Sequence, residues 1–454
     1  MQDDAPIIAI ATPPGHGGVG IVRVSSPTLA ALDGLIRQIS PRPLVPRIAT
    51  LLTLSDDAGA AIDQGVGLFF PGPASYTGEH VFEFQGHGGP AVLQAVLRRL
   101  LQLGQSTGLR LARPGEFTEK AFLNGKIDLT QAEAVADLIE ARSQSAAKAA
   151  AASLCGEFSR RVEQLATTLV NLRLLVEATL DFPEEEIDFL EKAGAREALM
   201  QARAQLQHLR DQAEQGARLR DGVRIVLAGR PNVGKSSLLN ALAQDDVAIV
   251  SPVPGTTRDR ISQTLEIGGL PVVLTDTAGL RDTTDEVETI GIERTRASLR
   301  QADLIFHILD ATEGMTLEDQ SLALAWPSAV PIVRIFNKAD LLDDDWPPSS
   351  DDAVYISAQT GVGLDGLQRI VFQRCGLLPG QTFAFLARQR HLEALKCAAD
   401  HLDQAAAHAR HDDRVLDLFA EELRLAHDAL GEITGRLVAD DLLGLIFGRF
   451  CIGK

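Results

Sequence analysis

The amino-acid sequence predicts a multidomain protein: an N-terminal α+β domain, then an all-α helical domain that carries an inserted α/β domain. Three observations lead to this fold class. Short apolar runs separated by Gly and Pro open the chain, a composition rich in Ala, Leu, Glu, Gln and Arg begins after Asp128, and a Gly-rich GxxxxGKS loop occupies residues 229–236. A length of 454 residues leaves room for roughly three domains.

Residues 1–118 are expected to form the α+β domain. We expect strands at Ile7–Ala11, Gly20–Val24, Gly67–Phe70 and Val81–Phe84, and an amphipathic helix at Pro90–Leu103. Residues 15–20 formally match GxGxxG, the phosphate-binding motif of dinucleotide folds. The residues that follow, Ile21-Val-Arg-Val, predict a strand instead of the helix that this motif requires, which argues against a dinucleotide site.

The helical domain is predicted to be divided in two by an insertion. Its first part is expected at 119–219 and its second part at 381–454, where the chain ends in Cys-Ile-Gly-Lys. Inserted domains join their hosts where their own termini lie close together. We therefore interpret residues 220–380 as a separate domain inserted into one helical domain.

Local patterns predict where the helices begin and end. Thr130 and Glu133 have the spacing of a capping box, which predicts a long helix that continues through the Ala-rich residues 146–152. A helical pattern from about Glu191 stops at Gly216. The pattern returns at about Leu386 and continues, with breaks, to Phe447.

The insertion is expected to contain a mostly parallel sheet covered on both faces, because apolar strands alternate with helical stretches. Val223–Ala228 leads into the Gly-rich loop, and Ser237–Ala243 begins the next helix. Gly268-Gly269 predicts a hairpin turn between Ile261–Ile267 and Pro271–Thr275. Further strands are expected at Leu304–Leu309, Pro331–Phe336 and Val354–Ile356.

Composition and charge exclude several classes of protein. A hydrophobic content of 45% and a charged content of 23% are typical of a soluble globular protein. The net charge of −18 argues against broad electrostatic binding of nucleic acid, and two Tyr and two Trp argue against a stacking platform for single strands.

Cysteine spacing and the absence of long apolar runs indicate the compartment. The four cysteines lie far apart without CxxC spacing, which predicts neither a zinc site nor a disulfide framework. The sequence begins with the acidic Gln2-Asp3-Asp4 instead of a basic signal, and no run reaches the ~18 apolar residues of a membrane span. We expect a cytoplasmic protein.

The Gly-rich loop and three later motifs together predict a guanine-nucleotide site. In the loop, Lys235 would reach the β- and γ-phosphates and Ser236 would bind Mg²⁺, although this motif alone also fits an ATPase. Asn337-Lys338-Ala-Asp340 decides the base, because one carboxylate accepts both the N1–H and the 2-amino group of guanine, and adenine offers no such pair of donors. The candidate GTP-binding residues are Gly229, Asn232, Val233, Gly234, Lys235, Ser236, Ser237, Ser251, Pro252, Val253, Pro254, Gly255, Thr256, Thr257, Asp276, Thr277, Ala278, Gly279, Asn337, Lys338, Ala339, Asp340, Ser357, Ala358 and Gln359.

The catalytic arrangement differs from that of Ras-like GTPases. Leu280 stands where those enzymes place a Gln that orients water, so hydrolysis needs another arrangement. Thr257 is suitably placed as the second hydroxyl ligand of Mg²⁺. Asn232 either caps the turn of the loop or, with carbonyls of the switch segment 251–259, ligates a monovalent cation that supplies the positive charge of an arginine finger.

The C-terminal Cys451-Ile-Gly-Lys454 does not fit a prenylation box, because Gly and a terminal Lys depart from that pattern. Cys451 follows the apolar run Leu442–Phe447, whose packing would position it. Two interpretations stay open: a free surface thiol, and a positioned nucleophile or sensor.

The order of these parts resembles the MnmE (TrmE) family of tRNA-modification GTPases, within the TrmE-Era-EngA-like P-loop GTPases. The resemblance covers essentially the whole chain and is carried by Ala11-Thr-Pro-Pro-Gly, Tyr76-Thr-Gly-Glu, Arg113-Pro-Gly-Glu-Phe-Thr and the terminal Cys-Ile-Gly-Lys. It implies an N-terminal α+β folate-binding-like domain that forms a constitutive homodimer. It also implies a central all-α helical domain and an inserted α/β Ras-like P-loop GTPase domain.

The resemblance also implies roles for individual residues. It implies tetrahydrofolate contacts at Arg23, Glu83, Lys126 and Lys454, and potassium ligands at Asn232, Ser251, Val253 and Thr256. Glu288 would orient the attacking water, whereas spacing alone makes it one of several acidic residues there. Cys451 would lie near the folate pocket with a catalytic role.

The reaction implied by the family is the addition of an aminomethyl-type (carboxymethylaminomethyl) group to C5 of wobble uridine in certain tRNAs. A 5-formyl- or 5,10-methylene-tetrahydrofolate would be bound, together with GTP or GDP, Mg²⁺ and K⁺. The implied partner is the FAD protein MnmG (GidA) in a heterotetramer, through which most tRNA contact would be made. The alternative function is a ribosome-assembly GTPase switch, which would be expected to carry a basic RNA-binding appendage.

Overall fold

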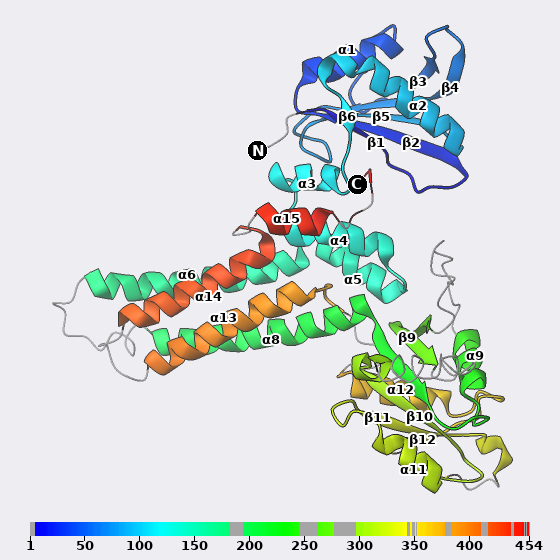
Figure 1. Ribbon diagram of the computed structural model, residues 1–454. Coiled ribbons are helices and arrows are strands. Elements are labelled where there is room, and N and C mark those ends of the chain that lie inside the picture. Colours follow the sequence, from blue (N-terminus) through cyan, green and yellow to red (C-terminus); the bar gives the residue numbers. More distant parts are fainter. Residues whose placement is uncertain are drawn as a thin grey trace. The chain divides into compact units, whose positions relative to one another are not determined.

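A computed structural model (Figure 1) describes residues 5–181, 194–245, 262–276, 297–342, 346, 350, 352–376, 383–409, 416–436, 440–448, 450 and 452–453. The chain divides into two compact units, one of Met1–Ala136 with His427–Lys454 and one of Asp137–Ala426. The domain boundaries expected from the sequence, after residues 118, 219 and 380, stay predictions.

The first unit contains a six-stranded sheet in the order β3-β4-β5-β2-β1-β6. Its strands are β1 (Ile7–Ile10), β2 (Gly17–Ser26), β3 (Thr50–Ser55), β4 (Ala61–Phe70), β5 (His80–Gly88) and β6 (Arg110–Leu111). Neighbouring strands are antiparallel except β1 and β6, which are parallel. The four strands expected from the sequence are confirmed, and the run after Gly15–Gly20 is the strand that argued against a dinucleotide site.

Two helices, α1 (Leu29–Ile39) and α2 (Pro90–Leu103), cover one face of this sheet (Figure 1). Alternation along β5 buries Phe82 and Phe84 in the core beneath them, as the two-residue period of a strand requires. The helix expected at Pro90–Leu103 is confirmed with those bounds. Ile7 and Ala9 of β1 point to the opposite face, where they meet Phe117.

The rest of the first unit is helical. The 3₁₀ helix η1 (Gln105–Thr107) and α3 (Glu116–Leu123) precede α4 (Leu129–Glu140), and α15 (Asp440–Phe447) lies near the C-terminus. A small apolar core joins the start of α4 to α15 through Leu129, Phe447 and Phe450. The C-terminal helix is thereby packed onto residues that lie more than three hundred positions earlier in the sequence.

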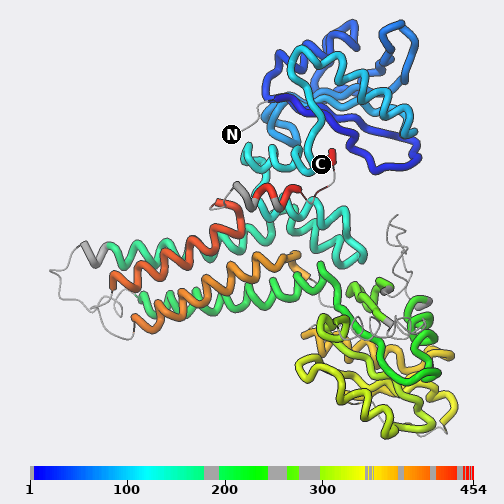
Figure 2. Tube along the Cα trace, viewed as in Figure 1, coloured from blue at the N-terminus to red at the C-terminus, as the bar shows by residue number. Residues whose placement is uncertain are grey.

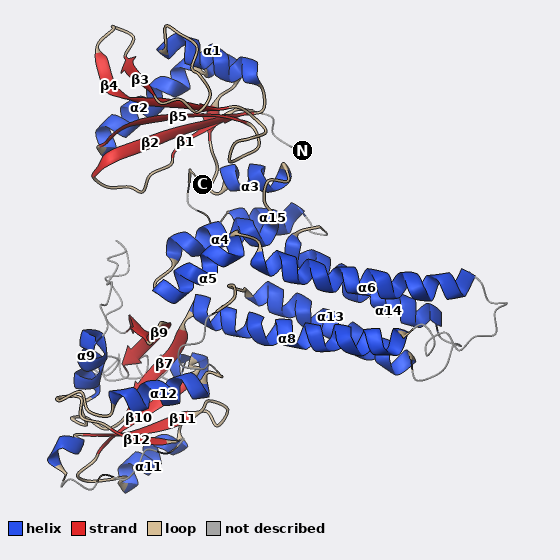
Figure 3. Ribbon diagram, turned by 180° about the vertical axis from the view of Figure 1, so that it is seen from behind, coloured by secondary structure: helices blue, strands red, loops and turns tan. Residues whose placement is uncertain are grey.

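Long helices make up one part of the second unit. They are α5 (Gln144–Leu154), α6 (Glu157–Asp181), α8 (Ala195–Asp221), α13 (Gln389–His408) and the part of α14 (Leu416–Thr434) that ends at Ala426. Helix α8 packs against both α6 and α13, and the tube in Figure 2 and the rear view in Figure 3 show these helices running side by side. A hydrogen bond between the His401 ring and Glu422 joins α13 to α14 at 2.7 Å.

The prediction of one long helix from residue 130 through 152 is wrong, because two helices, α4 and α5, occupy this stretch. Ser143 ends the continuity, since its side chain accepts a hydrogen bond from the Ala146 N–H at 3.1 Å and caps α5. The capping box at the start of α4 is also shifted. Asp128 Oδ1 accepts from the Gln131 N–H at 2.9 Å, and Gln131 Oε1 accepts from the Asp128 N–H at 3.0 Å, which leaves Thr130 inside the helix.

The prediction that a helix ends at Gly216 is also wrong, because α8 continues to Asp221 and is capped at Gly222. Gly216 lies where the backbone of residues 385–387 crosses the helix, and a Cβ there would stand 2.5 Å from the Phe385 carbonyl oxygen. This glycine therefore permits a close backbone approach and does not end the helix.

The second part of this unit is built on a six-stranded sheet in the order β12-β11-β10-β7-β9-β8. Its strands are β7 (Val223–Ala228), β8 (Ser262–Ile267), β9 (Leu270–Asp276), β10 (Leu304–Asp310), β11 (Ile332–Asn337) and β12 (Ala353–Tyr355). Only β8 runs antiparallel to its neighbour. Gly268 and Gly269 form the expected hairpin turn, with φ values of +57° and +90°.

Helices cover both faces of this sheet, as the sequence predicts. Helices α9 (Lys235–Asp245) and α12 (Leu364–Arg374) pack on one face. Leu299, Ala302 and Trp326 pack on the other face, near α11 (Leu317–Leu324). Among the described residues, no helix is long and apolar enough to cross a membrane.

Substitution of Gly216 by Ala should destabilise the protein, although Gly→Ala inside a helix ordinarily stabilises. The new methyl group would meet the Phe385 carbonyl oxygen, and such overpacking typically costs about 1–3 kcal/mol. Gly34→Ala in α1 is the matched control, because no atom lies within 4 Å of the new Cβ and a gain of up to ~1 kcal/mol is expected. Thermal unfolding of both variants measures the difference, and equal melting temperatures would contradict this account.

Candidate functional site

The residues of the predicted nucleotide site follow the carboxyl ends of neighbouring parallel strands. The loop 229–236 follows β7, Asp276 ends β9, Asn337 ends β11, and Ser357 follows β12. Strand β7 lies between β9 and β10. On one side of it follow β10, β11 and β12, and on the other side lie β9 and β8, so the direction in which strands are added to the sheet changes at β7. Ligands of open α/β sheets bind at such an edge.

The Gly-rich loop has a backbone that its glycines make accessible. Gly229 and Gly234 have φ values of +152° and +94°, and a Cβ on Gly234 would collide with the Asn337 side-chain nitrogen. Asn232 has a φ of +65°, in the left-handed region that Asn tolerates. The exposed Asn232 carboxamide makes no hydrogen bond to any described residue, so nothing in that part of the chain ties it down as a turn cap.

Lys235 and Ser236 begin α9 at the end of this loop. The Lys235 side chain is buried, and its Nζ donates to the carbonyl oxygens of Gly229 at 3.0 Å and Arg230 at 2.7 Å. Ser236 and Ser237 are exposed on the first turn of the helix. The arrangement fits a phosphate group, because a lysine ammonium, exposed hydroxyls and a helix N-terminus meet there.

Asn337 joins the two sides of the candidate site. Its Nδ2 donates to the Val233 carbonyl at 2.9 Å, and its Oδ1 accepts from the Ala358 N–H at 2.9 Å. The residue is 2% exposed. The buried amide therefore fixes the phosphate loop relative to the segment Ser357–Gln359.

The neighbouring residues leave a carboxylate available for a base. Lys338 has a φ of +64° and donates from Nζ to Asp310 Oδ2 at 2.7 Å. Asp340, in the 3₁₀ helix η3 (Ala339–Leu341), is exposed and has no hydrogen-bond partner among the described residues. Burial favours a raised pKa for Asp310, but hydrogen bonds from Lys338 and Thr312 outweigh it, so its pKa lies below the usual value and the carboxylate stays ionised beside Lys338.

Several candidate residues lie outside the described part of the chain. They are Ser251, Pro252, Val253, Pro254, Gly255, Thr256 and Thr257 of the first switch segment, Thr277, Ala278, Gly279, Leu280 and Glu288 of the second, and Cys451 and Lys454 at the C-terminus. Asp276 is described as the end of β9 but not in its side chain. Of the four candidate potassium ligands, Asn232 is the one in the described part.

The candidate folate residues Arg23 and Glu83 are brought together across the N-terminal sheet. They face each other on β2 and β5, and Arg23 Nε donates to Glu83 Oε1 at 2.7 Å. The Arg23 guanidinium lies over the rings of Tyr76 and Phe117, with distances of 5.5 and 5.8 Å to the ring centroids. Lys126 is exposed, and its side chain lies against Gly78 in the same loop as Tyr76.

Polar residues that the sequence motifs did not single out surround this pair. Tyr76 Oη and Thr118 Oγ1 share a hydrogen bond of 2.8 Å, and burial raises the pKa of Tyr76 despite that bond and the Arg23 charge. Lys120 Nζ donates to Glu79 at 2.7 Å. The signal was present, because the motifs beginning at Tyr76 and Arg113 carry these residues or lead directly to them.

Backbone contacts hold the C-terminal tail beside the N-terminal sheet. Ile452 forms an isolated antiparallel bridge with Pro114. Gly115 and Gly453 have φ values of +68° and +96°, and a Cβ on Gly115 would stand 2.5 Å from the Phe447 carbonyl oxygen. The described residues on both sides of Cys451 are thus placed near the end of β1, where Gly453 closely approaches Ile10.

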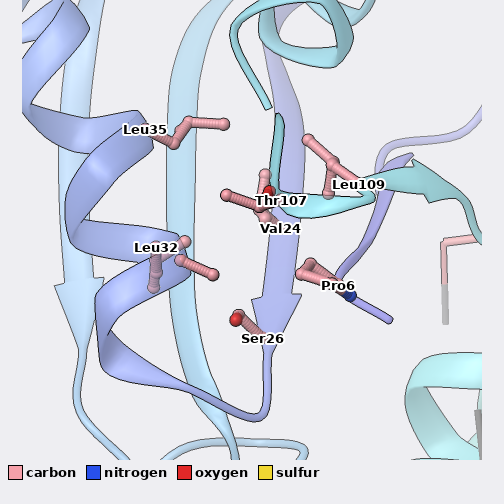
Figure 4. Close-up of a pocket in the computed structure, with 8 residues that line it drawn as sticks. Pro6, Val24, Ser26, Leu32, Leu35, Thr107 and Leu109 are labelled. Atoms are coloured by element: carbon pink, nitrogen blue, oxygen red, sulfur yellow. The ribbon is translucent and has the colours of Figure 1, made fainter. Parts of the chain in front are cut away.

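A small pocket in the N-terminal sheet does not include any candidate residue (Figure 4). Figure 4 shows Leu32, Leu35, Val24 and Leu109 lining it. Its hydroxyl groups are used locally, since Ser26 donates to the Thr28 carbonyl at 2.9 Å and Thr107 to the Gly104 carbonyl at 2.8 Å. We therefore interpret it as a gap between packed apolar side chains.

Comparison with known protein families gives two matches. Residues 6–126 match the family described as "GTP-binding protein TrmE N-terminus", and residues 129–451 match the "MnmE helical domain". A "tRNA modification GTPase MnmE" of Bordetella avium (strain 197N) is 56% identical over 454 residues, which is 100% of both chains. One of Paraburkholderia xenovorans (strain LB400) is 54% identical over 463 residues, covering 100% of this chain and 99% of that one.

Solved structures are similar to this chain over shorter stretches. Aquifex aeolicus Era bound to GDP·AlF4⁻ is 28% identical, covering 40% of this chain and 67% of Era, with a TM-score of 0.27. The G domain of Thermotoga maritima FeoB is 24% identical, covering 34% of this chain and 98% of that domain, with a TM-score of 0.25. At such low TM-scores these similarities carry no argument about function.

Substitution of Asn337 by Ala should weaken guanine-nucleotide binding by at least about tenfold. The change leaves the Val233 carbonyl and the Ala358 N–H without their buried partner, at roughly 1–3 kcal/mol for each unsatisfied group. Titration with a fluorescent GDP analogue measures the affinity. Asn124→Ala is the matched control, since it removes a 2.7 Å bond from a side-chain amide to the Thr77 carbonyl. Unchanged affinity in Asn337→Ala would refute its bridging role.

Proposed function

The chain belongs to the MnmE family of tRNA modification GTPases, and from this membership we propose the reaction that its GTP hydrolysis serves. With the FAD protein MnmG, the protein adds a carboxymethylaminomethyl-type group to C5 of wobble uridine in certain tRNAs. The one-carbon unit comes from a methylene-tetrahydrofolate. The identity of 56% over the full length of a relative named "tRNA modification GTPase MnmE" supports the proposal.

The nucleotide site supports GTP as the ligand. Asp340 is exposed next to the anchored Asn337, where its carboxylate can accept both donors of the guanine edge. Lys235 can exchange its two loop carbonyls for phosphate oxygens, which are stronger acceptors for an ammonium group. Ser236, together with Thr257, would supply the hydroxyl ligands of Mg²⁺ when the nucleotide is bound.

Potassium activation is proposed to replace the missing Gln and arginine finger. The Asn232 carboxamide makes no bond among the described residues and lies on the same loop as Lys235, so its oxygen is available to a cation beside the phosphates. Ser251, Val253 and Thr256 would complete the ligand set, and Glu288 would orient the attacking water. A positive charge at this position is worth about 10³–10⁵ in rate when an arginine supplies it.

The N-terminal site is proposed to bind the folate. Arg23 is held by Glu83 and lies over two aromatic rings, an arrangement that presents a guanidinium to a ligand carboxylate. Lys126 lies against the same loop as Tyr76 and adds a second cation. Lys454 and Cys451 are proposed to reach this region, which is supported by the contact of the neighbouring Ile452 and Gly453 with Pro114 and Ile10.

The nucleotide site and the N-terminal site are proposed to have different roles in the modification reaction. GTP hydrolysis is proposed to act as a conformational switch between the GTPase domains of a homodimer and not as a bond-making step in the tRNA. The net charge of −18 supports a heterotetramer in which MnmG makes most of the tRNA contacts. A tRNA substrate also supports a cytoplasmic location.

Replacement of K⁺ by Na⁺ at equal ionic strength should lower GTP turnover by at least about tenfold, because a cation of the wrong size fits the ligand set poorly. Asn232→Ala should turn over slowly in both salts, since the carboxamide ligand is gone. Steady-state phosphate release measures both rates. Equal rates of the unmodified protein in K⁺ and Na⁺ would refute the role of Asn232.

Cells that lack this protein should lose the C5-aminomethyl derivatives of wobble uridine. Mass spectrometry of digested bulk tRNA measures these nucleosides, and the intact gene should restore them. Cys451→Ser should fail to restore them, whereas Cys155→Ser, which changes an exposed free thiol elsewhere, should succeed. An unchanged nucleoside profile in the deleted strain would favour the ribosome-assembly switch and would leave the GTPase activity in place.

A further inference from the structure

Arg230, the second residue of the Gly-rich loop, is bound through its side chain to two carboxylates in the segment that follows β10. Its Nε donates to Asp319 Oδ1 at 3.0 Å, and its Nη2 donates to Glu313. The Arg230 side chain as a whole is 18% exposed. The following Pro231 restricts Arg230 to extended backbone conformations, which limits where this side chain can point.

Asp319 is the fixed partner of this arginine. It is fully buried, and besides Arg230 it accepts hydrogen bonds from the Thr316 N–H at 3.1 Å and the Thr316 hydroxyl at 2.7 Å. The bond from the Thr316 N–H, together with one of 3.3 Å from the Asp319 N–H to the Thr316 hydroxyl oxygen, forms the capping box of α11. Burial opposes ionisation, but the bonds from Thr316 and Arg230 outweigh it and lower the pKa of Asp319, so the carboxylate stays charged.

Asp310, at the start of the segment 310–319 that ends in Asp319, contacts the motif expected to recognise the base. Asp310 ends β10 and accepts from Lys338 Nζ at 2.7 Å and from the Thr312 hydroxyl at 2.7 Å. The N–H groups of Glu313 and Gly314 donate to the Asp310 carbonyl at 3.3 and 3.0 Å. Residues 310–319 therefore touch the phosphate loop through Arg230 and the Asn337-Lys338 loop through Asp310.

We propose that residues 310–319 form a bracket behind the nucleotide site and that Arg230 is a positioning residue for nucleotide binding. The inference rests on the guanine-nucleotide site described above. Arg230 is connected to the phosphate-binding lysine through its own backbone carbonyl, which accepts from Lys235 Nζ at 2.7 Å. With the side chain of Arg230 anchored, this carbonyl is fixed, and Lys235 is held where phosphate oxygens replace its loop acceptors.

The bracket differs from an ordinary surface ion pair, which contributes little. One of its carboxylates is completely buried, and the arginine spans two acids with separate nitrogens. Removal of the arginine leaves Asp319 as a buried charge short of one donor, which is costly in a protein interior. The bracket also joins two parts of the pocket that the chain separates by about one hundred residues, so its loss would loosen one part relative to the other.

The test is the rate at which a fluorescent GDP analogue leaves the full-length protein, followed by stopped-flow. Arg230→Ala should speed release about three- to tenfold, as expected for the loss of a charge-assisted hydrogen bond. Asp319→Asn should do the same with less risk to folding, because an Asn side chain can still accept from Thr316. Arg230→Lys keeps the charge but not the fork that spans two acids, so it should restore part of the slow release.

A double variant and a control separate positioning from general destabilisation. Arg230→Ala combined with Asp319→Asn should release the analogue no faster than the faster single variant, because both remove one interaction. Arg374→Ala is the matched control. It breaks an arginine–aspartate pair with Asp352, which precedes β12 at the edge of the sheet opposite the nucleotide site, so its release rate should not change.

Three outcomes would overturn the bracket: unchanged release from Arg230→Ala, equal acceleration in Arg374→Ala, or additive effects of Arg230→Ala and Asp319→Asn. Each differs from failure of the nucleotide site itself. If the nucleotide-site assignment is wrong, the unmodified protein will not bind the GDP analogue. If only the bracket proposal is wrong, the unmodified protein will bind the analogue tightly and the variants will not change its release.

Discussion

Two hydrogen bonds of one buried amide determine how the nucleotide site is assembled. Asn337 donates to the phosphate loop and accepts from the segment after β12, so three chain segments take their relative positions from a single side chain. The parallel sheet makes this possible, because it brings the carboxyl ends of β7, β11 and β12 to one edge. The glycine at position 234 is a consequence, since any Cβ there would occupy the space of the Asn337 nitrogen.

The C-terminal tail is also held in place by close contacts, but these join backbone atoms and do not involve side-chain hydrogen bonds. Gly115 and Gly453 both adopt positive φ, and both lie where backbone oxygens leave no room for a Cβ. Phe447 and Phe450 add an apolar core that fixes the helix before the tail. The Arg113-Pro-Gly motif is thus explained by its physical role, since it receives the end of the chain against the N-terminal sheet.

The sequence was most informative where structure follows from local chemistry. Apolar runs predicted the strands, and Gly268-Gly269 predicted the hairpin. It failed at Ser143, which divides the expected helix by capping α5 through its own side chain, and at Gly216, whose place inside α8 depends on residues far away in the sequence. Residues near Ser143 meet the β8–β9 hairpin through a 3.2 Å bond from Arg142 to Thr264, and Gly216 is required by the crossing of residues 385–387. Motifs also predicted a set of nucleotide-site residues, whose roles stay predictions, but they did not predict the Asn337 bond to a loop 104 residues earlier.

The Arg23–Glu83 pair shows why a predicted set of residues does not fix their roles. Glu83 is already engaged on both oxygens, by Arg23 at 2.7 Å and by Gln85 at 3.1 Å, and it is buried. A carboxylate in this state is better suited to orienting a neighbour than to binding a ligand on its own. Arg23, by contrast, uses Nε for Glu83, and its Nη groups form no hydrogen bond with the described residues. The pair therefore supports the proposal that Arg23 binds an anion, with the direction of its guanidinium set by Glu83 and its central carbon lying over the rings of Tyr76 and Phe117.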